Sequence, residues 1–179
     1  ILSVDNYVPT EYSSYYNREE QGNVVDYVIT MAYDEHHAGS EESGSVASYN
    51  FVKTGVENTL KEVPKEKVII GIPFFTRLWK ETPDGDGVKV TSQAYGMSEG
   101  MDVLKRNNAK IVWDEELQQN YGEFKEDGAT FKMWLEDEKS LEAKLKVISD
   151  SDVAGIAEWK LGLENKKIWN TIIKYIKTD

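Results

Sequence analysis

The chain has 179 residues, of which 40% are hydrophobic, so it is long enough to bury a sizeable core. Its mean hydropathy of −0.56 indicates a globular protein without a membrane-spanning segment. The 32 acidic and 21 basic residues give a net charge of −11, which argues against nucleic acid and anionic membranes as partners. Cysteine is absent, which excludes disulfides and thiolate metal sites but leaves the cellular compartment open.

The beginning of the chain predicts a strand and not a leader. Residues 1–8, ILSVDNYV, contain neither a basic segment nor an apolar signal core, and Ile1 stands where an initiator Met would be expected. We therefore expect this chain to be a piece of a longer protein.

Strands and helices are predicted to alternate early in the chain and again at its end. In order we expect a strand at 1–8, a helix at 12–21 stopped by Gly22, a strand at 24–33, a helix at 48–63 closed by Pro64, and a strand at 67–75. Between 77 and 151 we expect a turn at 84–87, a helix at 98–106, and short strands at 111–113, 122–125 and 130–136. The chain should end with a helix at 138–149 capped by Asp137, a strand at 153–161 and a helix at 165–177.

The run VVDYVITMAYDEHH, residues 24–37, is the most informative stretch. It is a strongly apolar, β-branched strand pattern that ends on Tyr33, Asp34 and Glu35. In parallel α/β architectures the carboxyl edge of the strands is where ligands bind. The sequence therefore predicts a ligand site at the end of this strand.

The order of elements predicts an α/β fold. Four strands that each lead into a helix are typical of parallel βα units, eight of which close into a (β/α)8 barrel, so this chain supplies half a barrel. We assign 1–77 to three barrel strands with their helices, 78–137 to an α+β insertion domain, and 138–179 to the last helix-strand-helix of the barrel. A half barrel has two unpaired edges. Either the other half or a second copy of the chain should cover them.

Four motifs in register carry a family resemblance. They are MAYD at 31–34, GIPFFTRLW at 71–79, WLED at 134–137 followed by Ser140 and Lys144, and GIAEWKLGLE at 155–164. Together they resemble the carboxyl-terminal half of glycoside hydrolase family 18, a chitinase-like family, and within it the bacterial spore-germination and cortex-lytic branch. The resemblance implies that the four strands are the fifth to eighth of the barrel, with the family's small insertion domain after the seventh.

The resemblance also implies a mechanism and residues that serve it. In that family the acetamido oxygen of the substrate attacks the anomeric carbon while one protein carboxylic acid protonates the leaving oxygen. By similarity, Tyr33 would donate its hydroxyl to the acetamido carbonyl and Asp34 would orient polar groups of the sugar, which makes these two the catalytic candidates. The substrate-binding candidates are Met31, Arg77 at the rim, Glu158, and Trp159 as the apolar floor beneath the sugar.

The acid itself has no counterpart in this chain. The family carries it at the end of the fourth strand in a D-x-x-D-x-D-x-E motif, and no such motif occurs in the 179 residues. The resemblance therefore implies a retaining hydrolase of β-1,4-linked N-acetylglucosamine polymers, chitin or spore-cortex peptidoglycan, in the intact protein, and an inactive chain on its own. The alternative is a carbohydrate-binding or cell-wall protein on the same fold that has lost the acid. The residues upstream of Ile1 discriminate between the two.

Each candidate also has a plainer interpretation. Tyr33 and Trp159 could be core aromatics, Asp34 could be a helix cap or a solvated acid, and Arg77 could be an ordinary surface arginine. His36 and His37 point apart and lack a third histidine, so we predict no metal site and no cofactor.

Three further expectations concern a loop, the tryptophans and the location of the protein. Residues 39–45, GSEESGS, indicate a mobile rim loop. The side chains of Trp79, Trp113 and Trp134 could line a saccharide cleft, and Trp134, in a strand, could equally belong to the core of the insertion. The implied partner, a polysaccharide rich in N-acetylglucosamine, points to an extracellular, cell-wall or spore-surface location.

Overall fold

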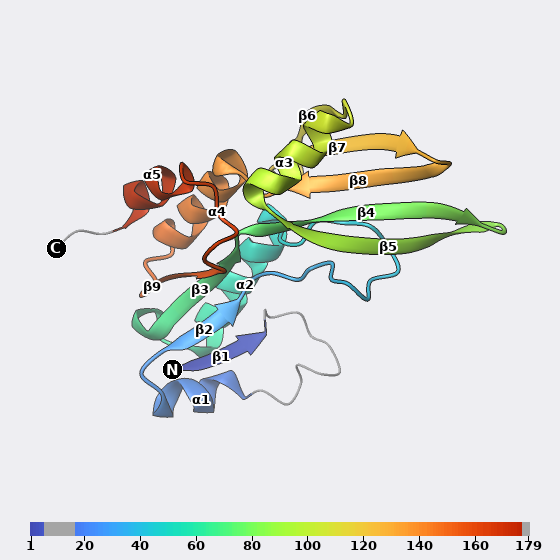
Figure 1. Cartoon of the computed structure of the whole chain (residues 1–179). Helices are drawn as coiled ribbons and strands as arrows, with labels where there is room; N and C mark the ends of the chain where they lie inside the picture. Colours follow the sequence, from blue (N-terminus) through green and yellow to red (C-terminus); the bar gives the residue numbers. More distant parts are fainter. Residues whose placement is uncertain (6–16, 177–179) are drawn as a thin grey trace.

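The computed structural model describes residues 1–5 and 17–176, which form two sheets and a layer of helices (Figure 1). Along the chain these elements are β1 Leu2–Asp5, α1 Arg18–Val24, β2 Val28–Met31, α2 Tyr49–Glu62, a 3₁₀ turn Lys65–Lys67, β3 Val68–Pro73, β4 Phe75–Asp84, β5 Gly87–Gly96, α3 Met97–Arg106, β6 Lys110–Asp114, β7 Gln119–Glu126, β8 Ala129–Leu135, α4 Glu138–Asp150, β9 Gly155–Trp159, α5 Ile168–Ile172, and a 3₁₀ turn Ile173–Tyr175.

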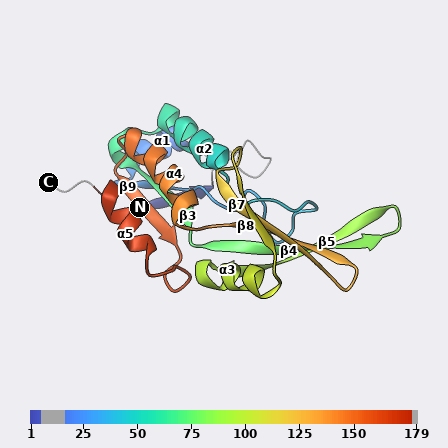
Figure 2. The ribbon, with the colours of Figure 1, turned by 90° about the horizontal axis from the view of Figure 1, so that it is seen from above.

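The first sheet is parallel throughout, with strand order β1-β2-β3-β9. Neighbouring helices pack in the order α1, α2, α4, α5, and the view from above shows them beside the sheet (Figure 2). Alternate residues of the strands, among them Val28, Val68 and Ile70, are fully buried in one core with residues of α2 and α4. Residues between them in the strands, such as Ile29 and Ile69, point to the opposite face and are only half-buried.

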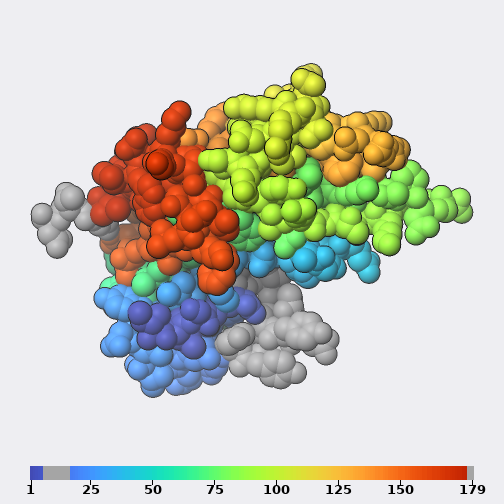
Figure 3. Space-filling view, in the orientation of Figure 1, coloured from blue at the N-terminus to red at the C-terminus, as the bar shows by residue number. Residues whose placement is uncertain are grey.

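The second sheet is antiparallel, with order β5-β4-β8-β7-β6. Strands β4 and β5 form a long hairpin that pairs Asp84 with Gly87, and Gly85 at its tip has φ +59°, a conformation that favours glycine. In the space-filling view the tip of this hairpin projects beyond the body of the molecule (Figure 3). Helix α3 covers one face of the sheet and packs Leu104 against Gly122, where a Cβ atom would collide with the leucine.

A buried ion pair lies where the two sheets meet. The carboxylate of Glu136, directly after β8, contacts the ammonium group of Lys144 on α4, and both side chains are fully buried. The same carboxylate accepts hydrogen bonds from Gln119 Nε2 at 2.8 Å and from the Ser140 hydroxyl at 3.0 Å. Gln119 Oε1 in turn accepts from the Ser45 hydroxyl at 2.5 Å. The network joins β7, β8, α4 and the loop that follows β2.

Many of the expected elements are confirmed. Helix α2 begins after Ser48, whose hydroxyl accepts a hydrogen bond from the Phe51 amide, and it ends before Pro64. Asp137 caps α4 through a capping box with Ser140, as the acidic string before that helix predicts. The turn at 84–87, helix α3, strands β6 to β9 and the parallel pairing also agree with the sequence-based expectations.

Four expectations about element bounds are wrong. Helix α1 runs through Val24, which is 82% exposed, so the next strand begins at Val28 and not at residue 24. Gly22 lies inside α1 and does not stop it, because Asn17 caps a helix that starts later than expected; residues 12–16 lie outside the described residues. Strands β4 and β5 were not expected at all. The last helix is short and gives way to a 3₁₀ turn.

Replacing Lys144 by Met should destabilise the protein, because the Glu136 carboxylate would stay buried without its cation. We expect a loss of about 3–5 kcal/mol in the free energy of unfolding near pH 8, measured by urea denaturation. Burial raises the pKa of Glu136 to about 7 from a reference of 4.5, against the opposing effect of Lys144, so losing Lys144 should raise it further. Because the pKa of Glu136 is higher in the folded than in the unfolded protein, the protonated carboxyl group favours the folded state at low pH, and this contribution disappears as the pH rises. The loss in the free energy of unfolding should therefore be smaller near pH 5.

Lys146→Met is the matched control. Lys146 lies on the same helix and pairs with Asp150, but both side chains are 69% exposed. We expect a change of less than about 0.5 kcal/mol for this variant. Equal losses in the two variants would contradict the importance of the buried pair.

Candidate functional site

The chain turns sharply after β2, and two candidate residues lie at that corner. Tyr33 packs edge-on against Phe75, with ring centroids 6.3 Å apart, and stacks on Trp159 at 6.5 Å with an angle of 27° between the planes. Asp34 follows with φ +62°, in the left-handed region. The ends of three neighbouring parallel strands, β2, β3 and β9, therefore bring these side chains together.

A cleft of about 340 Å³ opens beside this corner. One wall comes from the ends of β2 and β9, and the other from β4, β5 and the first turn of α3. Side chains with an aromatic or charged group that line it are Asp34, Phe75, Arg77, Tyr95, Glu99, Trp159 and Lys160. The cleft thus combines aromatic surface with both signs of charge, a combination suited to a polar ligand that carries apolar faces.

Trp159 ends β9 and is 54% exposed, so its ring is available to a ligand. Its carbonyl accepts a hydrogen bond from the Phe74 amide at 2.8 Å, and the peptide bond to Lys160 is cis. The segment that follows is anchored where Leu163 O accepts from the Met97 amide at 2.8 Å. A Cβ atom on Gly96 would lie only 2.8 Å from that same oxygen, so this close approach requires glycine.

The charges in the cleft act on one another. Burial raises the pKa of Asp34, and the positive charges of Arg77 and His37 act in the opposite direction. Burial also raises the pKa of the Tyr33 hydroxyl, and the neighbouring Asp34 carboxylate adds to that effect. Arg77 donates a hydrogen bond from Nη1 to the Ser92 hydroxyl at 2.9 Å, which holds it against β5. Tyr33 is therefore a neutral donor beside a carboxyl group.

The structure does not bring Met31 and Glu158 to the cleft. Met31 pairs with Gly71 within the parallel sheet and lies on the half-buried face of that sheet, two residues before Tyr33. Glu158 pairs with Ile72 and therefore points to the helix-covered side, where burial raises the pKa of its carboxyl group. Neither side chain lines the cavity, and Tyr33 itself adjoins it only through its stacking on Trp159.

Three tryptophans outside this cleft make contacts within the protein. Trp79 is 1% exposed and donates its indole N–H to Gly44 O at 2.8 Å. Trp134 packs on Tyr121 with centroids 4.9 Å apart, and the ammonium group of Lys139 lies 3.3 Å from the centre of the Trp113 ring. Their contacts favour a structural role over a saccharide-binding one.

The loop after β2 is exposed in its first half and buried in its second half. Glu41 and Glu42 are exposed, but Gly44 and Ser45 are buried, so the expectation of a mobile loop is wrong for its second half. His36 Nδ1 lies 2.9 Å from Ser45 O, while His37 Nδ1 accepts from the Gly39 amide. Among the described residues no group of three or more potential ligands could hold a metal ion, and no helix there is long and apolar enough to cross a membrane.

Sequence reasoning missed the wall that the antiparallel sheet contributes. Tyr95, on β5, and Glu99, in the first turn of α3, line the cleft although nothing in the motifs singles them out. The missing signal was β5 itself, because its sequence GVKVTSQAYG has no strict alternation of polar and apolar residues and most of the strand is exposed.

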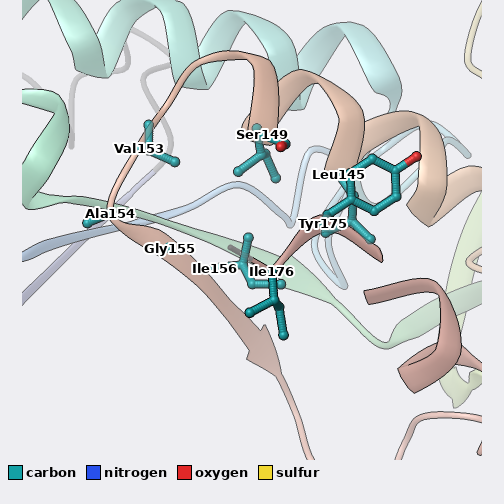
Figure 4. Close-up of a pocket in the computed structure, with 9 residues that line it drawn as sticks. Leu145, Ser149, Val153, Ala154, Gly155, Ile156, Tyr175 and Ile176 are labelled. Atoms are coloured by element: carbon teal, nitrogen blue, oxygen red, sulfur yellow. The ribbon is translucent and has the colours of Figure 1, made fainter. Parts of the chain in front are cut away.

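A second cavity, of about 180 Å³, lies on the other side of β9 (Figure 4). It is bounded by α4, β9 and the segment around Tyr175, and its lining is mostly apolar, with Leu145, Ile156 and Ile176 prominent. β9 is the last strand of the parallel sheet. This cavity therefore marks an apolar surface along an open sheet edge.

The fold and the cleft define an α/β protein with a candidate ligand site at the carboxyl ends of its parallel strands. The model of glycosyl hydrolases family 18 matches residues 2–164, and the chain belongs to this family. It is 26% identical over 149 residues to the cortical fragment-lytic enzyme of Bacillus subtilis, covering 83% of this chain and 34% of that protein.

Solved structures share the fold. The spore cortex-lytic enzyme SleL of Bacillus megaterium QM B1551 superposes with a TM-score of 0.83 at 22% identity, over 98% of this chain and 40% of that one. A plant class V chitinase mutant from Cycas revoluta, in complex with (GlcNAc)3, superposes with a TM-score of 0.74 at 22% identity, over 97% and 54%. The chain spans between 33% and 46% of the length of three Bacillus subtilis relatives.

Replacing Arg77 by Met should raise the pKa of Asp34 further, because the guanidinium group is the main opposing influence on it. An NMR titration of the Asp34 carboxyl carbon measures this directly. Arg106→Met, at the exposed end of α3, is the control and should leave the titration unchanged. An unchanged or lowered pKa in Arg77→Met would rule out the influence of Arg77 on Asp34.

Proposed function

We propose that the intact protein hydrolyses β-1,4-linked N-acetylglucosamine polymers, with retention of configuration and with the substrate's acetamido group as nucleophile. The observation that carries the proposal is a cleft lined by Asp34 and the exposed Trp159 ring, with Tyr33 stacked on that ring. Family membership supports the class of reaction.

The residues of this chain suit the proposed roles. Trp159 offers a flat apolar ring on which a pyranose face packs and excludes water. Tyr33 remains protonated because its pKa is raised, so its hydroxyl can donate to the acetamido carbonyl as that oxygen attacks the anomeric carbon. Asp34 is placed to orient the acetamido N–H and to balance the positive charge that develops on the oxazolinium ring. Arg77 would bind sugar hydroxyls at the rim.

The acid that protonates the leaving oxygen would come from outside these 179 residues. We propose that the parallel sheet is the carboxyl-terminal half of a (β/α)8 barrel, with the antiparallel sheet as an insertion domain between its last two strands. Three features of the described residues support a covering partner: the edge strands β1 and β9, each paired on one side only, the half-buried face of the sheet, and the apolar cavity beside β9. The amino-terminal half is the favoured occupant, and a second copy is the alternative.

The spore cortex is the favoured substrate and chitin the alternative. The matched relatives include cortical fragment-lytic and spore cortex-lytic enzymes, and one structural neighbour is a chitinase bound to (GlcNAc)3. Either substrate places the protein outside the cytoplasm, at the cell wall or the spore surface. A non-catalytic carbohydrate-binding protein on the same fold is the second candidate function, because the motif that decides between the two lies outside this chain. An upstream copy of the motif ending in Glu would favour the enzyme, and a substituted Glu the binder.

Tyr33→Phe in the intact protein should lower kcat on N-acetylglucosamine oligomers by about 10²–10³, because it removes a donor to the reacting oxygen, equivalent to about 3–4 kcal/mol. Steady-state kinetics of purified variants test this. Tyr27→Phe is the matched control, since Tyr27 lies before β2 and is exposed. An unaltered kcat in Tyr33→Phe would remove Tyr33 from the catalytic assignment.

The 179-residue chain alone should show no hydrolysis of the same oligomers, because it lacks the proton donor for the leaving oxygen. Turnover that persists through repeated purification would overturn this expectation.

Sedimentation of the same chain tests how its edges are covered. A well-behaved monomer would argue against pairing of two copies through β1 or β9.

A further inference from the structure

The backbone at Asp34 is held in an unfavourable conformation. Its φ of +62° lies in the left-handed region, which costs a residue with a Cβ atom about 1 kcal/mol or more. Such a conformation persists only when neighbouring contacts fix it. On one side of this corner the Ala32 amide donates to Gly71 O at 2.8 Å, and on the other side the contacts come from the residues that follow Asp34.

Glu35 makes those contacts. Its amide donates to Val46 O at 3.0 Å, and the next amide, that of His36, donates to Ser45 O at 3.1 Å. Its carboxylate binds Ser48 with both oxygens: Oε2 accepts from the Ser48 amide at 2.7 Å, and Oε1 accepts from the Ser48 hydroxyl at 3.0 Å. Main-chain and side-chain hydrogen bonds thus join Glu35 and His36 to residues 45–48, the end of the loop before α2, which we call the returning arm.

Ser48 is a rigid anchor. It is buried and caps α2, a helix of 14 residues that packs Val52 and Val56, one turn apart, into the core. The carboxylate faces the positive end of that helix, and hydrogen bonds to an ionised acceptor are stronger than those between neutral groups. The contact therefore ties the corner to the core of the parallel layer.

The returning arm is also fixed from the opposite side. The Ser45 hydroxyl donates to Gln119 Oε1, and Gln119 Nε2 donates to the buried Glu136. Glu35 therefore connects Asp34 to the returning arm, which hydrogen bonds hold in place from both sides. Its own side chain does not line the cleft.

We propose that Glu35 is a positioning residue: by clamping Ser48 it holds Asp34, and with it the Tyr33 hydroxyl, in the geometry that the reaction needs. This rests on the proposed function of the cleft. Glu35 acts through Asp34 and does not touch the substrate.

The test compares Glu35→Leu with Glu35→Gln in the intact protein. Leu removes both acceptors, and we expect kcat to fall by about 10²-fold, the usual cost of a displacement near 1 Å, with KM changed less than threefold. Gln keeps an acceptor for the Ser48 amide and can donate to its hydroxyl, so it should restore most of kcat. Amide exchange at Glu35 and Ser48 should become at least tenfold faster in Glu35→Leu only.

Two controls separate positioning from stability. Glu42→Gln removes an exposed carboxylate from the same loop and should leave kcat and exchange unchanged. Val56→Ala weakens the packing of α2 without touching Glu35, so it should lower Tm while kcat per folded molecule stays constant. A Glu35→Leu enzyme with wild-type kcat overturns the proposal and leaves the proposed function intact. If the wild-type protein hydrolyses nothing, the proposed function fails, and unchanged exchange at Glu35 would then sink the positioning role independently.

Discussion

The buried pair of Glu136 and Lys144 is the constraint on which the arrangement of the two sheets depends. A charge without solvent is tolerated only when a counter-charge and hydrogen bonds surround it, so β8, β7 and α4 have little freedom to move relative to one another. Through Gln119 and Ser45 the same network reaches the loop after β2. The antiparallel sheet is thereby attached to the corner that carries Tyr33 and Asp34, and not only to the ends of β3 and α4 through the chain.

The cleft divides its tasks between the two sheets. Tyr33 and Trp159 come from the parallel sheet, where ladder pairing through β3 fixes their separation. Arg77 and Tyr95 come from the antiparallel sheet and form the facing wall. Residues of the facing wall can therefore change without disturbing the stacking of Tyr33 on Trp159.

The parts of the fold and site that depend on local sequence pattern could be predicted. Apolar runs located β2, β3 and β9, the Ser48 and Asp137 caps located two helices, and the motifs placed Tyr33, Asp34, Arg77 and Trp159 near one another. Pairing between distant residues could not be predicted. The outward direction of Glu158 follows from its register with Ile72, and the burial of Glu136 follows from Lys144 eight residues later meeting it across a helix turn. Hairpin β4–β5 was missed because most of β5 and the outer end of β4 are exposed, and β5 lacks a strict alternation of polar and apolar residues.

The pairing of β3 with β9 has a kinetic consequence. Ile69 meets Gly155 only after the whole antiparallel sheet and two helices have intervened in the chain. Closing so long a loop costs entropy that grows slowly with length, and a folded intervening unit shortens the effective loop. Contacts so distant in sequence form late, because their entropy must be lost before they are made. We therefore expect the stacking of Tyr33 on Trp159 to form late, and a chain in which β1, β2 and β3 have already paired still lacks the cleft until β9 joins the sheet.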